Sequence, residues 1–185
     1  KDLLQKNYRF KSNSDTEVII YSYKEWGIDC IKKFNGDFAM AIYDTRTDEL
    51  FVVRDRLGIK PVYYSKIGRN FVFASEIKSI LSFPGFKRKV NLMAVSSYLS
   101  YRYVIGTETL FDGILKLLPG HYIHIKNKKI NIHEFWDINL SSKIDAGEDY
   151  LKKEIRKLLK KATEYRMISD VPIGAYLSGG LDSSV

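Results

Sequence analysis

The chain has 185 residues, 45% of them hydrophobic, and carries a net charge of +8. No apolar run approaches the roughly 20 residues that cross a membrane, and the single cysteine excludes an internal disulfide framework and favours a reducing cytoplasm. The basic residues are spread along the chain and are densest at residues 152–161, opposite an apolar helical face, so we expect a solvated surface and neither nucleic acid nor membrane as a partner.

The first predicted element is a helix over residues 15–26. Ser14 and Glu17 have the spacing of a capping box, which places Asp15 in the first helical turn. A second short helix is expected at residues 28–33.

The most strand-like region follows these helices. Residues 34–43 are apolar on both faces, which predicts a strand buried within a layered sheet, and residues 49–54 return as a second strand. Two further hairpins are predicted, with strands at residues 62–66, 70–75, 121–125 and 130–136. Helices are expected after Ser75, which would cap the first of them, and over residues 92–101.

A polar stretch, residues 139–147, is the expected linker between two domains. The long helix that follows has an apolar face formed by Leu151, Ile155, Leu158, Leu159 and Ala162. Residues 171–177 then read as a buried apolar strand that runs into a Ser/Gly-rich loop.

This loop, residues 178–184, indicates a polyphosphate site. Two adjacent glycines let backbone N–H groups approach a ligand, and the start of a helix would direct its positive dipole end there. The hydroxyls of Ser178, Ser183 and Ser184 add donors, and Asp182 offers a hard oxygen ligand for Mg²⁺. The loop has no lysine and is therefore not a Walker A motif. The alternative is an ordinary turn.

Several motifs together resemble a known family. Residues 34–39, 54–64, 73–78 and 118–121 look like segments of class II glutamine amidotransferases, and the loop resembles that of ATP pyrophosphatases. In this order they resemble glutamine-hydrolysing asparagine synthetase. The Arg-Asp-Arg element alone would also suit glutamine phosphoribosylpyrophosphate amidotransferases, which the loop on the same chain excludes.

The resemblance implies an α+β and α/β architecture. Residues 1–138 would be the C-terminal part of an N-terminal-nucleophile glutaminase, an αββα sandwich. Residues 148–185 would supply the first helix and strand of a parallel-sheet ATP pyrophosphatase domain. The implied enzyme is a cytoplasmic ligase that uses glutamine, ATP and Mg²⁺ to convert aspartate to asparagine through β-aspartyl-AMP and channelled ammonia, and a homodimer is left open.

The resemblance also assigns site residues. Residues 12–18 match the segment whose aspartate binds glutamine, so Asp15 takes that role, and its carboxylate suits an α-ammonium group. The alternative is that Asp15 only complements the helix dipole, worth about 0.3–1 kcal/mol. Nucleotide binding is assigned to Leu177, Ser178, Gly179, Gly180, Asp182, Ser183 and Ser184. Asp182 is the candidate Mg²⁺ ligand, and its alternative is an acid at a helix N-terminus.

No catalytic residue is expected within this chain. The family's nucleophile is an N-terminal cysteine, expected upstream of Lys1, so the chain is interpreted as an internal fragment that is inactive by itself. Cys30 is expected to be a small core residue. Arg54, Asp55 and Lys60 are interpreted as an ion-pair network that fixes an irregular loop, and the three histidines are not spaced as a zinc site.

Two other functions remain open. The same chemistry could act on another carboxylate, such as a sugar acid, a peptide or a β-lactam precursor. A non-catalytic regulatory homologue would keep the fold and lack the nucleophile.

Overall fold

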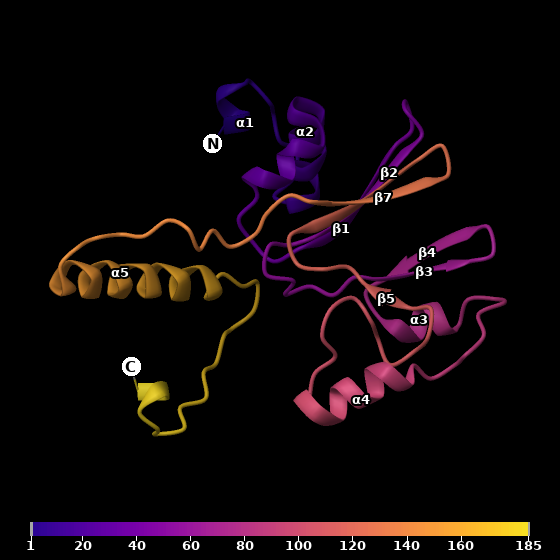
Figure 1. Ribbon diagram of the computed structural model, residues 1–185. Helices are drawn as coiled ribbons and strands as arrows, with labels where there is room; N and C mark the ends of the chain where they lie inside the picture. The colour runs from indigo at the N-terminus through magenta and orange to yellow at the C-terminus, as the bar shows by residue number, and fades with distance from the viewer. Residues whose placement is uncertain (1, 185) are drawn as a thin grey trace. The chain divides into compact units, whose positions relative to one another are not determined.

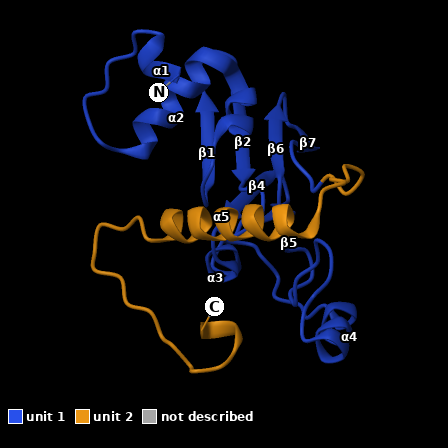
Figure 2. Ribbon diagram, turned by 90° about the vertical axis from the view of Figure 1, so that its left-hand side faces the viewer, with its two compact units in different colours: residues 1–138 blue, residues 139–185 orange. Residues whose placement is uncertain are grey.

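The computed structural model describes residues 2–184, and the chain divides into two compact units, Lys1–Ile138 and Asn139–Val185 (Figure 2). The first unit begins with a short helix α1 (Asp2–Gln5), followed by α2 (Asp15–Trp26) and a 3₁₀ helix, η1 (Gly27–Lys33). The predicted helix over residues 15–26 is confirmed. Its stop is Gly27, whose φ of 58° lies in the left-handed region that glycine adopts readily. Within residues 2–184, no helix is both long and apolar enough to span a membrane.

Two antiparallel sheets form the centre of the first unit, which confirms a mixed α+β architecture. The four-stranded sheet has the order β1-β2-β6-β7 and the three-stranded sheet the order β4-β3-β5. Their strands are β1 (Ala39–Asp44), β2 (Glu49–Arg54), β3 (Tyr63–Ile67), β4 (Asn70–Ala74), β5 (Leu115–Lys116), β6 (His121–Lys126) and β7 (Lys129–Glu134). Both predicted hairpins are present, and the long-range pairing of β2 with β6 sets Val52 opposite Ile123.

Strand β2 supplies side chains to two cores. Val52 packs with Val62, Tyr64, Leu117 and Ile123 between the two sheets. Phe51 and Val53 point to the other face and pack with Cys30 and Ile31 of η1. The period-2 alternation of a strand therefore joins a helix layer, the four-stranded sheet and the three-stranded sheet (Figure 1). Each fully buried aliphatic side chain contributes about 1.5–3 kcal/mol to this arrangement.

A second helix layer adjoins the three-stranded sheet. Helix α3 (Ile77–Leu81) contacts β3 and β4 and buries Ile80 completely. It lies on the side of that sheet away from the four-stranded sheet, with α4 (Leu92–Tyr101) beyond it (Figure 1). The predicted cap at Ser75 is wrong: Glu76 occupies the N-cap position and makes no side-chain capping bond.

Strand β1 differs from its prediction. It starts at Ala39 and is the outermost strand of its sheet, and its side chains alternate between exposed and partly buried, so only one of its faces is covered. Met40 and Ile42 pack toward the core with η1, whereas Ala39, Ala41 and Tyr43 are exposed. An apolar run can therefore mark an edge strand with one covered face.

The second unit contains one long helix, α5 (Glu148–Arg166), as predicted. None of its residues is buried, and Ile155, Leu158 and Leu159 remain 56–61% exposed. The strand expected at residues 171–177 is not formed. A strand needs a hydrogen-bonding neighbour, and residues 139–184 contain no other strand that could pair with it. A short 3₁₀ helix, η2 (Asp182–Ser184), follows the Ser/Gly-rich loop.

Candidate functional sites

Asp15 is the first residue of α2, and the loop before it is tightly hydrogen-bonded. Ser14 is the N-cap, and its Oγ accepts a hydrogen bond from the Thr16 backbone N–H at 3.2 Å. The predicted capping box is only half formed, because the Glu17 carboxylate does not bond to the Ser14 N–H. It accepts instead from the backbone N–H groups of Lys11 and Ser12, one turn further back.

A groove of about 870 Å³ runs between α2 and the open edge of β1. Helix α2 contributes Asp15, Thr16, Ile19, Ile20, Tyr23 and Lys24, and the facing wall consists of residues 37–46 with Lys60, Pro61 and Ser75. Within residues 2–184, the Asp15 carboxylate accepts only one hydrogen bond, a long one of 3.5 Å from the Thr16 hydroxyl. Asp15 thus presents an almost unengaged carboxylate to a groove large enough for a small molecule.

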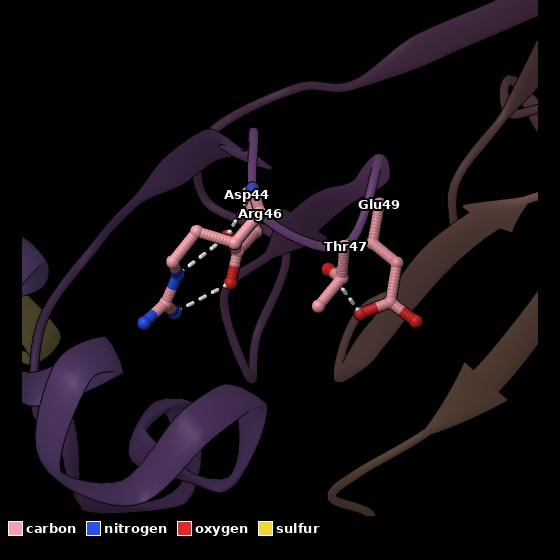
Figure 3. Close-up of polar contacts among 4 residues, drawn as sticks. All are labelled: Asp44, Arg46, Thr47 and Glu49. Atoms are coloured by element: carbon pink, nitrogen blue, oxygen red, sulfur yellow. Dashed lines mark hydrogen bonds and ion pairs between the residues drawn. The ribbon is translucent and has the colours of Figure 1, made fainter.

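The charges where β1 ends are, in contrast, already paired. Asp44 is almost fully buried and binds the Arg46 guanidinium through Nε at 3.0 Å and Nη2 at 2.7 Å (Figure 3). The Arg46 side chain and backbone N–H lower the pKa of Asp44 to about 2. Burial, followed by the charge of Asp44 and a hydrogen bond to it, raises the pKa of Tyr23 to about 12. This cluster joins the β1–β2 turn to α2 and leaves little charge for a ligand.

The neighbouring Glu49 is occupied as well. Its carboxylate accepts from the Thr47 hydroxyl at 2.8 Å (Figure 3) and lies 2.8 Å from Lys126 Nζ. These contacts, with that of Lys126 the strongest, lower the pKa of Glu49. The two acidic residues that flank the turn therefore stabilise the hairpin, and Asp15 is the carboxylate best placed to meet a ligand.

The irregular connection after β2 is held by two charged side chains, the buried Asp55 and the partly buried Arg54. Asp55 is 1% exposed and accepts from the backbone N–H groups of Leu57, Ile59 and Lys60 at 2.9–3.1 Å. Arg54 donates to three backbone carbonyls, those of Gly58, Lys60 and Leu117. The predicted role in fixing the loop is correct, but the predicted ion-pair network is wrong. Within residues 2–184, both side chains bond the backbone and not each other.

Cys30 has the predicted character of a core residue. It is completely buried in the cluster of Phe51 and Val53, and burial raises the pKa of its thiol to about 11. A thiol in this environment is a poor nucleophile near neutral pH.

The Ser/Gly-rich loop in the second unit has a definite local structure. Gly179 has a φ of 72°, and the Ser178 and Ser183 hydroxyls lie 2.8 Å apart. The Gly180 carbonyl accepts from the hydroxyls of Ser183 at 3.0 Å and Ser184 at 2.8 Å. Three of the predicted nucleotide-binding residues, Ser178, Ser183 and Ser184, thus lie around a fourth, Gly180. Leu177 is 73% exposed, and within the described chain the Asp182 carboxylate makes no hydrogen bond or ion pair.

Sequence reasoning did not predict how differently three aspartates of the first unit are engaged by their neighbours. Asp44, Asp55 and Asp15 each stand at the end of an element, and only the structure shows that two of them are saturated and one is not. One signal was present: Asp44 precedes Arg46 by two residues at a turn, a spacing that allows a local ion pair. The structure places Asp15 in the first unit and the Ser/Gly-rich loop in the second.

Comparison with known proteins agrees with the division of the chain. The glutamine amidotransferase domain family matches residues 1–136, and the asparagine synthase family matches residues 154–185. Asparagine synthetase (glutamine-hydrolyzing) 3 of Bacillus subtilis is 39% identical over all of this chain and 30% of its own length. Amidase chry2 of Gibberella zeae is 35% identical over all of this chain and 27% of its own length. The chain thus spans less than a third of these relatives.

A solved structure, the glutamine phosphoribosylpyrophosphate amidotransferase of Bacillus subtilis, is also similar. It has a TM-score of 0.47 and 21% sequence identity, and the match covers 73% of this chain and 25% of that one. Because the glutamine amidotransferase match covers most of the sequence, the chain belongs to the family of glutamine amidotransferase domains, here joined to an asparagine synthase segment.

Proposed function

We propose that the protein containing this chain is a glutamine-dependent ligase that converts aspartate to asparagine. The observation that carries the proposal is the order of two family matches on one chain, a glutamine amidotransferase domain followed by an asparagine synthase segment. Residues 1–138 would belong to an N-terminal-nucleophile glutaminase domain, residues 139–147 to a linker, and residues 148–185 to the start of an ATP pyrophosphatase domain.

In the glutaminase, Asp15 would bind the α-ammonium group of glutamine. Support comes from its position in the groove wall with a carboxylate that accepts only a long hydrogen bond. A charge-assisted contact there would orient the substrate. The nucleophile would be an N-terminal cysteine outside this chain, since the buried, high-pKa Cys30 does not suit the role.

In the synthetase part, residues 177–184 would bind the phosphates of ATP. The donor set fits a magnesium–polyphosphate group: a glycine with positive φ, three serine hydroxyls of which two bond the Gly180 carbonyl, and a carboxylate without a partner in the described chain. Asp182 would hold Mg²⁺, which when bound neutralises phosphate charge. The hydroxyls of Ser178, Ser183 and Ser184 would donate hydrogen bonds to phosphate oxygens.

The complete reaction would proceed in two halves. Hydrolysis of glutamine yields glutamate and ammonia. Transfer of AMP from ATP to the β-carboxylate of aspartate releases pyrophosphate, and channelled ammonia then displaces AMP to form asparagine. Adenylation is necessary because a free carboxylate is too poor an electrophile for ammonia.

A different carboxylate acceptor is the second candidate. One observation favours it: a relative that is 35% identical over the whole chain is named an amidase and not an asparagine synthetase. Relatives at this level of identity therefore carry different names. The two candidates share every residue assigned above.

A product assay on the full-length protein tests the proposal. With glutamine, aspartate, Mg²⁺ and ATP we expect asparagine, AMP and pyrophosphate in equal amounts. Amidation of another carboxylate without asparagine would reject aspartate and support the second candidate. Absence of AMP formation with any carboxylate would reject the ligase.

Two substitutions in the full-length protein test the division of roles. Asp182→Ala should abolish ATP-dependent synthesis and leave glutamine hydrolysis in place. Asp15→Ala should impair the use of glutamine, and ammonia should then replace it. Equal damage to both activities by both substitutions would contradict the assignment of the two sites.

A further inference from the structure

We infer that Glu17 is a positioning residue for the amide donor: its carboxylate fixes the loop before α2 and thereby holds Asp15 in the groove. The inference rests on the proposed function of Asp15. It adds a residue that does not itself line the groove and therefore acts through its neighbours.

The contacts of Glu17 form a short relay to Asp15. The carboxylate accepts from the Lys11 N–H at 2.9 Å, the Ser12 N–H at 2.8 Å and the Ser12 hydroxyl at 2.6 Å. The same Ser12 hydroxyl accepts from the Ser14 N–H at 3.3 Å, and the Ser14 hydroxyl accepts from the Thr16 N–H at 3.2 Å. The two neighbours of Asp15 in the chain are therefore linked to Glu17 indirectly: Ser14 through the Ser12 hydroxyl, and Thr16 through the hydroxyls of Ser14 and Ser12.

Glu17 is itself held from behind by an aromatic cluster. Tyr21, one turn further along α2, lies close enough to contribute to the lowering of the pKa of Glu17, after the larger contributions of Ser12 and Lys11. The Tyr21 ring packs against Tyr8 and Phe10, with ring centroids 5.0 and 5.3 Å apart. The relay thus begins in packed side chains and ends at Asp15, which is the arrangement that keeps a binding group in place without contacting the ligand.

The position requires an ionised acceptor. The carboxylate receives backbone N–H and hydroxyl donors, and these hydrogen bonds lower the pKa of Glu17. A glutamine side chain has nearly the same shape but presents an amide NH₂ toward some of those N–H groups. Glu17→Gln should therefore loosen the loop at residues 11–14 and leave the rest of α2 intact.

The same helix offers a matched control. Glu25, in the last turn of α2, accepts from Lys6 Nζ at 2.5 Å and the Tyr8 hydroxyl at 3.0 Å, and so also ties the preceding segment to the helix. Glu25→Gln removes a comparable set of charged contacts more than two turns away from Asp15. If the KM for glutamine rises only because the segment before α2 is less tightly held, it should rise in both variants. If Glu17 positions Asp15, the KM should rise only in Glu17→Gln.

The experiment measures both nitrogen donors in the full-length protein. For Glu17→Gln we expect the KM for glutamine to rise about tenfold, with the rate of ammonia-driven synthesis and the melting temperature unchanged. Ser12→Ala, an exposed substitution that removes one hydroxyl of the relay, should raise the same KM by a smaller factor. Glu25→Gln should leave the KM for glutamine unchanged.

The possible failures are distinguishable. If Asp15→Ala does not change the KM for glutamine, the proposed role of Asp15 is wrong and the inference falls with it. If Asp15→Ala raises that KM while Glu17→Gln and Ser12→Ala do not, only the inference is overturned. Equal losses with glutamine and ammonia in Glu17→Gln would indicate a merely structural role and would also overturn it.

Discussion

The two units of the chain stabilise their candidate sites in different ways. In the first unit, strand β2 is buried on both faces, and the buried Asp55 and the partly buried Arg54 anchor the loop after it. In the second, no residue of α5 is buried and residues 171–181 are exposed. The polar contacts of its loop span at most five positions in sequence. The groove at Asp15 thus depends on tertiary packing, whereas the Ser/Gly-rich loop keeps its shape through local hydrogen bonds.

This difference shows what each kind of site needs. A turn made by short-range hydroxyl bonds and one positive-φ glycine can form without a core. A groove between a helix and a strand exists only when both elements are held by other layers. Substitutions of the same type should therefore have unequal effects in the two units. Both tryptophans of the chain, Trp26 and Trp136, lie in the first unit, so their fluorescence reports its unfolding.

The largest difference is expected between two glycines with similar backbone angles. Gly120 has a φ of 67°, and a Cβ there would overlap the Trp136 carbonyl oxygen. Gly179 has a φ of 72°, and a Cβ there would meet nothing within 4 Å. Gly120→Ala should lower the free energy of unfolding by about 4 kcal/mol, since it adds overlap with the backbone to an unfavourable φ.

The control is Gly179→Ala, which carries only the φ cost of about 1 kcal/mol, confined to its own loop. Urea denaturation of residues 1–185, followed by tryptophan fluorescence, should show a shifted midpoint for Gly120→Ala and none for Gly179→Ala. Equal midpoints for the two variants would contradict the view that Gly120 is locked between β7 and the loop after β2.

An intermediate difference is expected between two isoleucines. Ile123 of β6 is fully buried between the sheets, and Ile155 of α5 is 56% exposed. Ile123→Ala should cost about 3 kcal/mol, because it removes buried methyl groups and leaves a cavity. Ile155→Ala should change the same unfolding transition by less than about 0.5 kcal/mol. A cost at Ile155 equal to that at Ile123 would show that α5 is packed as tightly as the sheets.

Sequence patterns correctly predicted the helices and hairpins whose formation depends on residues close together in the chain. Helix α2 has a capping residue, Ser14, before it and a glycine, Gly27, at its end. The turns of the two hairpins contain residues with positive φ, Gly68 in one and Asn127 and Lys128 in the other. The prediction failed where the answer depends on a neighbour. Residues 34–43 were predicted to form a strand covered on both faces, although one face of β1 is exposed. Residues 171–177 were predicted to form a strand, but residues 139–184 hold no strand to pair with it.

The candidate sites followed the same rule. The family motifs led to Asp15 and to the loop, but not to the acceptors and donors that surround them. That Glu17 bonds to Lys11 and Ser12, and that Arg54 and Asp55 bond the backbone, depends on the path of loops whose geometry no periodicity encodes. Hydrogen bonds between charged side chains and the backbone of loops are therefore the part of the site that sequence patterns predict least well.

The smallest effect is expected from a change of charge at the end of the groove. Because the pKa of Asp44 is lowered from 3.8 to about 2, its ionised form stabilises the folded state above about pH 4. This contribution is lost as the pH falls from about 4 to about 2, where the carboxylate becomes protonated in both states. Asp44→Asn should therefore lower the melting temperature at pH 7 and approach the unsubstituted protein near pH 2.

The comparison between units gives this prediction its control. Asp182 bears the same carboxylate in the second unit, where no described residue pairs with it, so Asp182→Asn should leave the melting temperature at pH 7 unchanged. Scanning fluorimetry of both variants and the unsubstituted chain from pH 2 to pH 7 measures the difference. If the Asp44→Asn deficit persisted undiminished at pH 2, the stabilisation would come from the shape of the side chain and not from its charge. The ion pair with Arg46 would then not be what stabilises the β1–β2 turn.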